Sequence, residues 1–263
     1  MRHTIVIEHV GKQFRRYHHD RPWTWQEMFQ RGMRRVKPAE QFWALRDVSL
    51  TVAAGRMVGV VGGNGAGKST LLRLLGGVGR PTEGRIQVDG RIDALLDLGA
   101  GFHPDLTGRE NVFISGVING LTRREVARQF DSIVAFSELD EFIDFPLRTY
   151  STGMQMRLAF AVATHTHPSI LLIDEVLAVG DLAFQRKCLE RIEQFKVEGC
   201  TIILVSHDTG LVSELCDEAV WLQGGRLIDY GCAKPVVDRY IKQAASHDND
   251  SNLVSTQPSL FGV

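Results

Sequence analysis

The sequence predicts an α/β protein whose core is a mainly parallel sheet. Three short apolar runs are typical of central strands that are covered on both faces: "RMVGVVG" from Arg56, "SILLIDEV" from Ser169 and "TIILVSHD" from Thr201. The first run leads into a glycine-rich loop and then into the helical pattern "STLLRLLGG". A helical stretch from Leu182 to Val197 joins the other two, as in a right-handed crossover between parallel strands.

Bulk composition limits the possible classes of protein. A chain of 263 residues with 44% hydrophobic content can build one large domain or two small ones. The formal charge of −1 does not predict a nucleic-acid partner. The four cysteines are far apart and form no C-x-x-C pair, so neither a zinc site nor a disulfide framework is indicated. No stretch approaches the roughly 18 apolar residues of a membrane span, and the N-terminus lacks a signal-peptide pattern.

The middle and the end of the chain differ from this α/β pattern. Residues 105–156 are predicted to form a helical insert, with capping boxes at Thr107 with Glu110 and at Thr122 with Glu125. The stretch 244–263 is polar and has little periodicity, which predicts a flexible tail without a fold of its own.

The glycine-rich loop "GGNGAGKST" matches the pattern G-x-x-x-x-G-K-[ST] between a predicted strand and a predicted helix. Glycines in such a loop let backbone N–H groups converge on phosphate oxygens at the start of the helix. Lys68 is expected to reach the β- and γ-phosphates and Ser69 to ligate Mg²⁺. The alternative is a glycine-rich turn that binds nothing. The predicted ATP-binding residues of this loop are Gly62, Gly63, Asn64, Gly65, Ala66, Gly67, Lys68, Ser69 and Thr70.

Two strand ends supply candidate catalytic groups. Asp174 ends the apolar strand "ILLID" and is predicted to hold Mg²⁺, directly or through water. Glu175 follows it and is the candidate general base for an attacking water. His207, in "ILVSHD", is predicted to face the γ-phosphate. The alternatives are a solvated acidic turn and a structural histidine.

The stretch "RTYSTGMQMRLAFA" from Arg148 has the pattern of a helix start. Thr152 and Gln155 fit a capping box. Gly153 in the first turn costs about 1 kcal/mol relative to alanine, unless a ligand approaches the bare backbone there. The pattern therefore leaves two interpretations, a simple helix cap and a ligand contact.

In this order the motifs resemble those of the nucleotide-binding subunit of an ABC transporter, over residues 1–243. The resemblance implies a P-loop NTPase fold of ABC type, with an antiparallel β subdomain, a helical subdomain and ATPase activity with ATP and Mg²⁺. It implies a homodimer that sandwiches two ATP molecules, in which Ser151 and Gly153 of one subunit meet the γ-phosphate on the other. Asp181 corresponds to the position of communication between subunits. A separate transmembrane permease and a peripheral location on the cytoplasmic face of the inner membrane are implied as well.

Three segments are similar to the ATPases of polysaccharide exporters in particular. They are "YSTGM" from Tyr150, "LLDLGAGFHPDLTGREN" from Leu95 and "DEVLAVGDLAFQRKC" from Asp174. This similarity implies a lipid-linked polysaccharide as cargo, of the O-antigen, capsule or teichoic acid kind. The usual loop glutamine of the wider family is replaced around Leu98 and Gly99, and Phe102 and His103 are the expected contacts with the permease.

Other functions remain open at this stage. One is an ABC ATPase for another cargo, such as a small lipid or a drug, and another is a soluble ABC switch protein. The latter usually has two fused ATPase domains or long coiled-coil inserts, and neither pattern is present. Some polysaccharide exporters add a C-terminal glycan-binding module, and the residues after Ala244 are too few for a β-sandwich of about 100 residues.

The region before the glycine loop holds two further candidates. Phe14 is the expected adenine-stacking residue, with Phe42 and Trp43 as alternatives. The insert at 15–41 interleaves arginines with aromatic residues, a composition that suits anionic lipid headgroups or a diphosphate-linked lipid. An equally weighted alternative is a basic surface hairpin that packs against its own domain. The aromatic residues of the insert are Tyr17, Trp23, Trp25 and Phe29.

Overall fold

A computed structural model describes residues 3–16, 40–95, 99, 101–166, 168–174 and 180–254. Within these residues the strands form two sheets, which confirms the predicted class of a mainly parallel core with an antiparallel β subdomain. The smaller sheet is antiparallel with the order β2-β1-β4. Its strands are β1 (His3–Arg16), β2 (Glu40–Ala53) and β4 (Glu83–Val88).

The larger sheet has the strand order β5-β6-β7-β3-β8-β9. Its strands are parallel except for β9, which is antiparallel to β8. All five residues of both β3 and β7 are buried, as expected for central strands. The strands are β3 (Met57–Val61), β5 (Ile92–Leu95), β6 (Ile170–Asp174), β7 (Thr201–Val205), β8 (Glu218–Gln223) and β9 (Arg226–Cys232).

Two hydrophobic clusters cover the two faces of the larger sheet. One face packs against α2 (Lys68–Leu75) and the antiparallel sheet, with Val58 and Val60 of β3 turned toward them. The other face packs against α5, α6, α7 and α8, with Met57 and Val61 of β3 turned toward these helices. These helices are α5 (Thr152–Ala163), α6 (Leu182–Val197), α7 (Thr209–Leu215) and α8 (Ala233–Val254).

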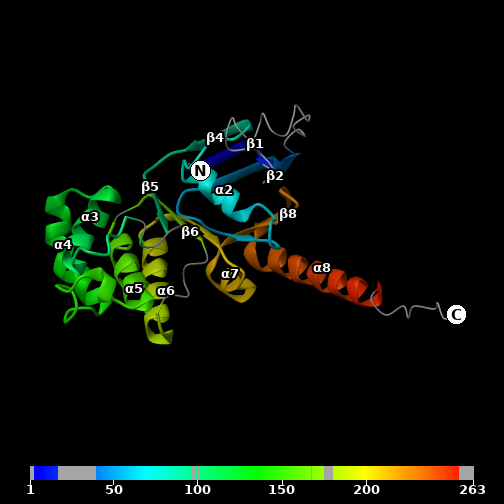
Figure 1. Ribbon diagram of the computed structural model, residues 1–263. Helices are drawn as coiled ribbons and strands as arrows, with labels where there is room; N and C mark the ends of the chain where they lie inside the picture. Colours follow the sequence, from blue (N-terminus) through cyan, green and yellow to red (C-terminus); the bar gives the residue numbers. More distant parts are fainter. Residues whose placement is uncertain are drawn as a thin grey trace, which may run out of the picture.

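A third cluster forms the core of the helical subdomain, which lies at one end of the molecule (Figure 1). It joins α3 (Gly108–Ile118), α4 (Arg123–Ser137), the 3-10 turn η1 (Leu147–Thr149) and α5. The capping boxes predicted at Thr107 and Thr122 are present at the starts of α3 and α4. The subdomain continues past the expected boundary at 156, because α5 runs to Ala163 and its later residues belong to the same cluster.

Helix α6 spans Leu182–Val197, the range predicted for the crossover between β6 and β7. Strand β1 runs to Arg16 and β2 begins at Glu40, so the antiparallel hairpin takes up both ends of the 15–41 insert. Residues 17–39 lie outside the described part of the chain.

The stretch after 243 differs from the expectation of a tail without a fold, because α8 continues to Val254. Its first turns are held by Val236 and Val237, which are buried in the sheet-covering cluster, and by a T-shaped contact between Tyr240 and Trp221. In Figure 1 the helix extends away from the sheet toward the C-terminus. Residues 255–263 are outside the described range.

Candidate functional site

The register of the parallel strands places three predicted segments at one edge of the sheet. Val205 at the end of β7 is paired with Val60 of β3 on one side and with Asp174 of β6 on the other. The glycine loop begins at Gly62, two residues after Val60, and His207 follows Val205 by the same interval. The glycine loop, Asp174 and His207 therefore meet at the carboxyl edge of the sheet, where ligands of open α/β sheets bind.

The glycine loop has a conformation that other residues would not adopt. Gly62 has φ 151°, and a Cβ placed on it would lie 2.2 Å from the carbonyl oxygen of Leu222. Gly67 has φ 106° and caps the start of α2. A Cβ on Gly63 or Gly65 would meet no atom within 4 Å, so these two residues face open space. The loop is thus packed at its two ends and open between them, as a phosphate cradle requires.

Lys68 lies inside this loop. Its Nζ donates hydrogen bonds to the carbonyl oxygens of Gly62 at 2.7 Å and Gly63 at 3.1 Å, and the residue is only 7% exposed. Burial lowers the pKa of Lys68, and the negative charge of Asp174 partly opposes this shift. The ammonium group is therefore held within the loop and close enough to Asp174 to be influenced by its charge.

Oxygen ligands for a divalent cation are present in the same place. Asp174 and Ser69 are partly buried, and a carboxylate with a hydroxyl is a donor set that suits Mg²⁺. The strand register places Asp174 at the same edge of the sheet as the loop that carries Ser69. Glu175, the predicted general base, lies outside the described residues. His207 is exposed in the connection between β7 and α7.

The start of α5 differs from the capping box predicted for Thr152 and Gln155. Ser151 is the N-cap, and its Oγ accepts a hydrogen bond from the backbone N–H of Met154 at 3.2 Å. The Gln155 side chain instead donates to the carbonyl oxygens of Leu147 and Tyr150. The N-cap therefore lies one residue before the predicted Thr152. Ser151 has the extended backbone of an N-cap, with φ −66° and ψ 159°, whereas Thr152 is the first residue with helical geometry.

Gly153 leaves the first turn of α5 open. The nearest atom to a Cβ built on it would be Ser151 Oγ at 3.8 Å, and Ser151 itself is exposed. Tyr150 anchors this turn to the helical subdomain, because its hydroxyl donates a hydrogen bond to the carbonyl oxygen of Phe142 at 2.6 Å. Burial raises the pKa of Tyr150 to about 12, so the phenol stays protonated as a donor. The helix start is therefore both capped and accessible.

Asp181 is the N-cap of α6. Its Oδ1 accepts from the backbone N–H of Phe184 at 2.9 Å, and its Oδ2 accepts from Arg157 on α5 at 2.6 Å. This pairing between α5 and α6 was not predicted, because no local pattern marks two residues that are 24 positions apart.

The aromatic alternatives for adenine stacking form a single patch on the β1–β2 hairpin. Phe14 and Phe42 are paired across the hairpin and stack with ring centroids 5.8 Å apart. Both are exposed, at 40% and 50%, and Lys12 Nζ lies 5.3 Å from the Phe14 ring centre. Trp43 is less exposed, and its ring lies against Gly11.

The segment that follows β5 contains the predicted contacts for a membrane partner. His103 is exposed, whereas Phe102 is half-buried against the core of the helical subdomain, contrary to the expectation that both are exposed. The buried Asn111 holds this segment, since its Oδ1 accepts from His103 N at 2.7 Å and its Nδ2 donates to His103 O at 3.0 Å. Gly99 is described, while Leu98 is outside the described residues.

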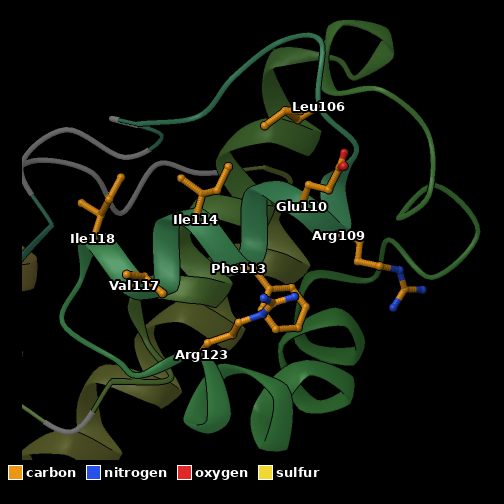
Figure 2. Close-up of a pocket in the computed structure, with 8 residues that line it drawn as sticks. All are labelled: Leu106, Arg109, Glu110, Phe113, Ile114, Val117, Ile118 and Arg123. Carbon is orange, nitrogen blue, oxygen red and sulfur yellow. The ribbon is translucent and has the colours of Figure 1, made fainter.

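An apolar groove of about 610 Å³ runs along α3 (Figure 2). Ile114, Val117 and Ile118 are 37%, 50% and 62% exposed on this face. The groove was not predicted from the sequence, although apolar residues on more than one face of α3 indicate such a surface. Its charged lining residues are Arg109, Glu110 and Arg123.

A parallel sheet with this glycine loop and a carboxylate on the neighbouring strand defines a nucleotide-binding P-loop protein. The chain belongs to the ABC transporter family, because the model of that family matches residues 45–178. The ATP-binding cassettes of this family are ATPases, and this chain is such an ATP-binding cassette.

Two curated relatives carry the printed name "O-antigen export system ATP-binding protein RfbB". The one from Myxococcus xanthus is 52% identical over 88% of this chain and 52% of its own length. The one from Klebsiella pneumoniae is 45% identical over 93% of this chain and 99% of its own length. The chain thus spans about half of the first relative and nearly all of the second.

A solved dimer of an ATP-binding cassette in a post-hydrolysis state, bound to ADP and Pi, is similar in fold. Its TM-score is 0.69 at 21% identity, with 87% of this chain and 98% of that chain covered. This likeness confirms the ABC ATPase fold. Across the described residues, no helix combines the length and the apolar character that crossing a bilayer requires.

Proposed function

We propose that this chain is the ATP-hydrolysing subunit of an ABC exporter that moves a lipid-linked polysaccharide of the O-antigen kind across the cytoplasmic membrane. The observation that carries the choice of cargo is the 45% identity to the Klebsiella relative, which this chain matches over 99% of that protein's length. The subunit would act from the cytoplasmic face of the inner membrane, bound to a separate transmembrane permease.

The glycine loop and the Phe14 patch of each subunit would bind that subunit's own nucleotide. The backbone N–H groups of the loop around Gly63 and Gly65, where an added Cβ would meet open space, would hold phosphate oxygens. Lys68 would turn from the loop carbonyls to the β- and γ-phosphates. Phe14, in its stacked pair with Phe42, would cover one face of the adenine ring.

The start of α5 would bind the nucleotide of a second copy. The glycine loop packs with the cluster between the two sheets, whereas the turn at Tyr150 packs with the helical subdomain. Ser151 and Gly153 are accessible in their own subunit, which fits a role as contacts for the γ-phosphate held by the partner. The proposal is therefore a homodimer with two ATP molecules in the interface.

Hydrolysis would use groups at the carboxyl edge of the sheet. Mg²⁺, held by Ser69 and Asp174, would neutralise charge on the transferred phosphoryl group. Glu175 would accept a proton from the attacking water, and His207 would orient toward the γ-phosphate. Loss of the γ-phosphate removes contacts that hold the two copies together, and the dimer opens.

The permease would dock on the helical subdomain. The exposed side chains of Ile114, Val117 and Ile118 offer an apolar surface, and Arg123 at its edge suits an amphipathic helix with an acidic flank. His103 lies on the segment that adjoins this subdomain and is exposed.

The test is co-purification with the candidate permease, followed by ATPase assays with purified lipid-linked glycans. Stimulation by O-antigen-type glycan supports the proposal. Stimulation of the ATPase activity by a teichoic acid or capsule precursor alone would overturn the proposed cargo. Failure of the chain to co-purify with the permease would overturn the proposed role in export.

A matched pair of variants tests the docking surface. Ile118→Glu should abolish co-purification with the permease, while Val197→Glu should not, because Val197 is 88% exposed at the far end of α6. Both variants should bind ATP as the wild type does. Equal co-purification of the two variants would contradict docking on α3.

A further inference from the structure

The turn between β8 and β9 joins the glycine loop to strand β2. The backbone N–H of Gly225 in this turn donates to the carbonyl oxygen of Ala66 in the loop at 3.1 Å. The carbonyl oxygen of Gly225 accepts from the backbone N–H of Arg46 in β2 at 2.7 Å. Ala66 and Leu45, the residue before Arg46, are both buried in the cluster between the two sheets. One residue of the turn is therefore bonded to both the loop and β2.

The carbonyl group of Ala44 in β2 lies close to two glycines. A Cβ built on Gly67, which directly precedes Lys68, would lie 2.6 Å from the Ala44 oxygen, and a Cβ built on Gly225 would lie 2.8 Å from it. Both glycines have a left-handed backbone, with φ 106° and 77°. The glycine loop, β2 and the β8–β9 turn thus meet at one carbonyl group, and glycine at these two positions leaves room for it.

Strand β2 also carries part of the aromatic patch proposed for adenine. Phe42 lies two residues before Ala44, which is about 7 Å along a strand, and it stacks on Phe14. The glycine loop follows β3 of the larger sheet, whereas Phe14 and Phe42 belong to the smaller sheet. The distance between the patch and the loop therefore depends on how β2 packs against the loop, and Gly225 contacts both.

We propose that Gly225 is a positioning residue that sets the distance between the base site and the phosphate site, so that one nucleotide can bind both at once. A ligand gains affinity from two linked sites only when their spacing matches its own length. This inference rests on the adenine contact of the Phe14 patch in the proposed function. It assigns Gly225 no contact with the nucleotide itself.

Gly225→Ala tests this role, because the added methyl group meets β2 and not the glycine loop. The three atoms nearest to the new Cβ are O and C of Ala44 and Cα of Leu45, all on β2. The substitution should displace β2, while the hydrogen bond to Ala66 holds the turn to the loop. Calorimetric titration should show an affinity for a non-hydrolysable ATP analogue that is lower by about tenfold, as expected for lost base stacking. The affinity for inorganic tripolyphosphate, which has no base, should stay within about twofold of wild type.

The comparison of the two ligands separates positioning from a general loss of stability. Both ligands bind only the folded protein, so partial unfolding lowers both apparent affinities by the same factor. Equal losses for the two ligands in Gly225→Ala would overturn the inference. Wild-type affinity for both ligands would overturn it as well.

Gly224→Ala is the matched control in the same turn. Gly224 also has a left-handed backbone, with φ 55°, but a Cβ built on it would meet no atom within 4 Å. This variant should lose some thermal stability through its strained backbone and keep both affinities within about twofold of wild type. A loss of ATP-analogue affinity as large as that of Gly225→Ala would show an effect of backbone strain in the turn, and would overturn the inference.

A combination with Phe14→Ala tests the link to the base. Once stacking is lost, Gly225→Ala should lower the affinity for the ATP analogue by less than about twofold further. Additive losses would overturn the inference.

Hydrogen exchange of the wild type tests the inference if Gly225→Ala does not fold. Tripolyphosphate should slow exchange of the Arg46 amide, which bonds Gly225 and lies on β2, because the loop, the turn and β2 open as one unit. Unchanged exchange at Arg46 in the tripolyphosphate complex would overturn the inference.

Two outcomes separate this inference from the proposed function. Wild-type affinity for the ATP analogue in both Phe14→Ala and Phe42→Ala would overturn the proposed adenine patch, and the inference with it. A wild type that binds the ATP analogue and not tripolyphosphate would overturn the inference alone, because the glycine loop would then not bind phosphates independently of the base.

Discussion

Ser151 Oγ accepts a hydrogen bond from the backbone N–H of Met154 at 3.2 Å and so caps the helix that carries Gly153. Ser151 is an exposed residue at the start of the helix, where a phosphate would bind. A cap and a ligand contact are therefore compatible in one side chain, and substitutions can separate the two roles.

Ser151→Asp should retain stability and lose activity. Aspartate caps helices as well as serine does, but it places a negative charge where the γ-phosphate of the partner subunit is expected. Ser151→Ala should instead lose about 1 kcal/mol of stability through the missing cap. Thermal unfolding and ATPase assays on both variants measure this difference. Full ATPase activity in Ser151→Asp would contradict the phosphate contact.

Phe14→Ala should weaken ATP affinity by about tenfold, because stacking of a base on an aromatic ring contributes on the order of 1–3 kcal/mol. Phe42→Ala is the matched variant, since Phe42 stacks on Phe14 with a similar exposure. Its effect should be smaller. Titration with a fluorescent ATP analogue compares them, and a larger loss in Phe42→Ala would reverse the assignment.

Native thiol reactivity should report on the packing of the sheet and its covering helices. Burial raises the pKa of Cys188, Cys200 and Cys216 to about 12 in each case, whereas Cys232 is exposed. At pH 8 these three thiols are almost fully protonated and shielded, and only thiolates react quickly. A chromogenic disulfide reagent should therefore detect one fast thiol in the native protein and four after unfolding.

The Cys232→Ser variant serves as the control for this measurement. It should show no fast thiol before unfolding. Rapid reaction of a second thiol in the native wild type would contradict the packing of α6 and α7 on the sheet.

The sequence predicted best the features that local rules determine. The glycine loop, the capping boxes at Thr107 and Thr122 and the helix from Leu182 to Val197 each follow from residues close together in the chain. The parallel pairing of β3, β6 and β7 follows from apolar strands linked by a crossover.

Other features depend on contacts between distant residues or on small differences in backbone conformation. The cap of α5 falls on Ser151 and not on Thr152, and both residues have a hydroxyl that can act as a cap. Helix α8 continues to Val254 through a polar stretch that lacks an apolar stripe. The pairing of Arg157 with Asp181 arises only when α5 and α6 pack side by side.

The central claim is that two copies of this chain clamp ATP between the Lys68 loop of one and the Ser151 turn of the other. The most direct test is size-exclusion chromatography with light scattering on Glu175→Gln, which should bind MgATP but hydrolyse it extremely slowly. The account predicts a dimer with MgATP and a monomer without nucleotide. A Glu175→Gln protein that binds MgATP and remains a monomer would contradict it.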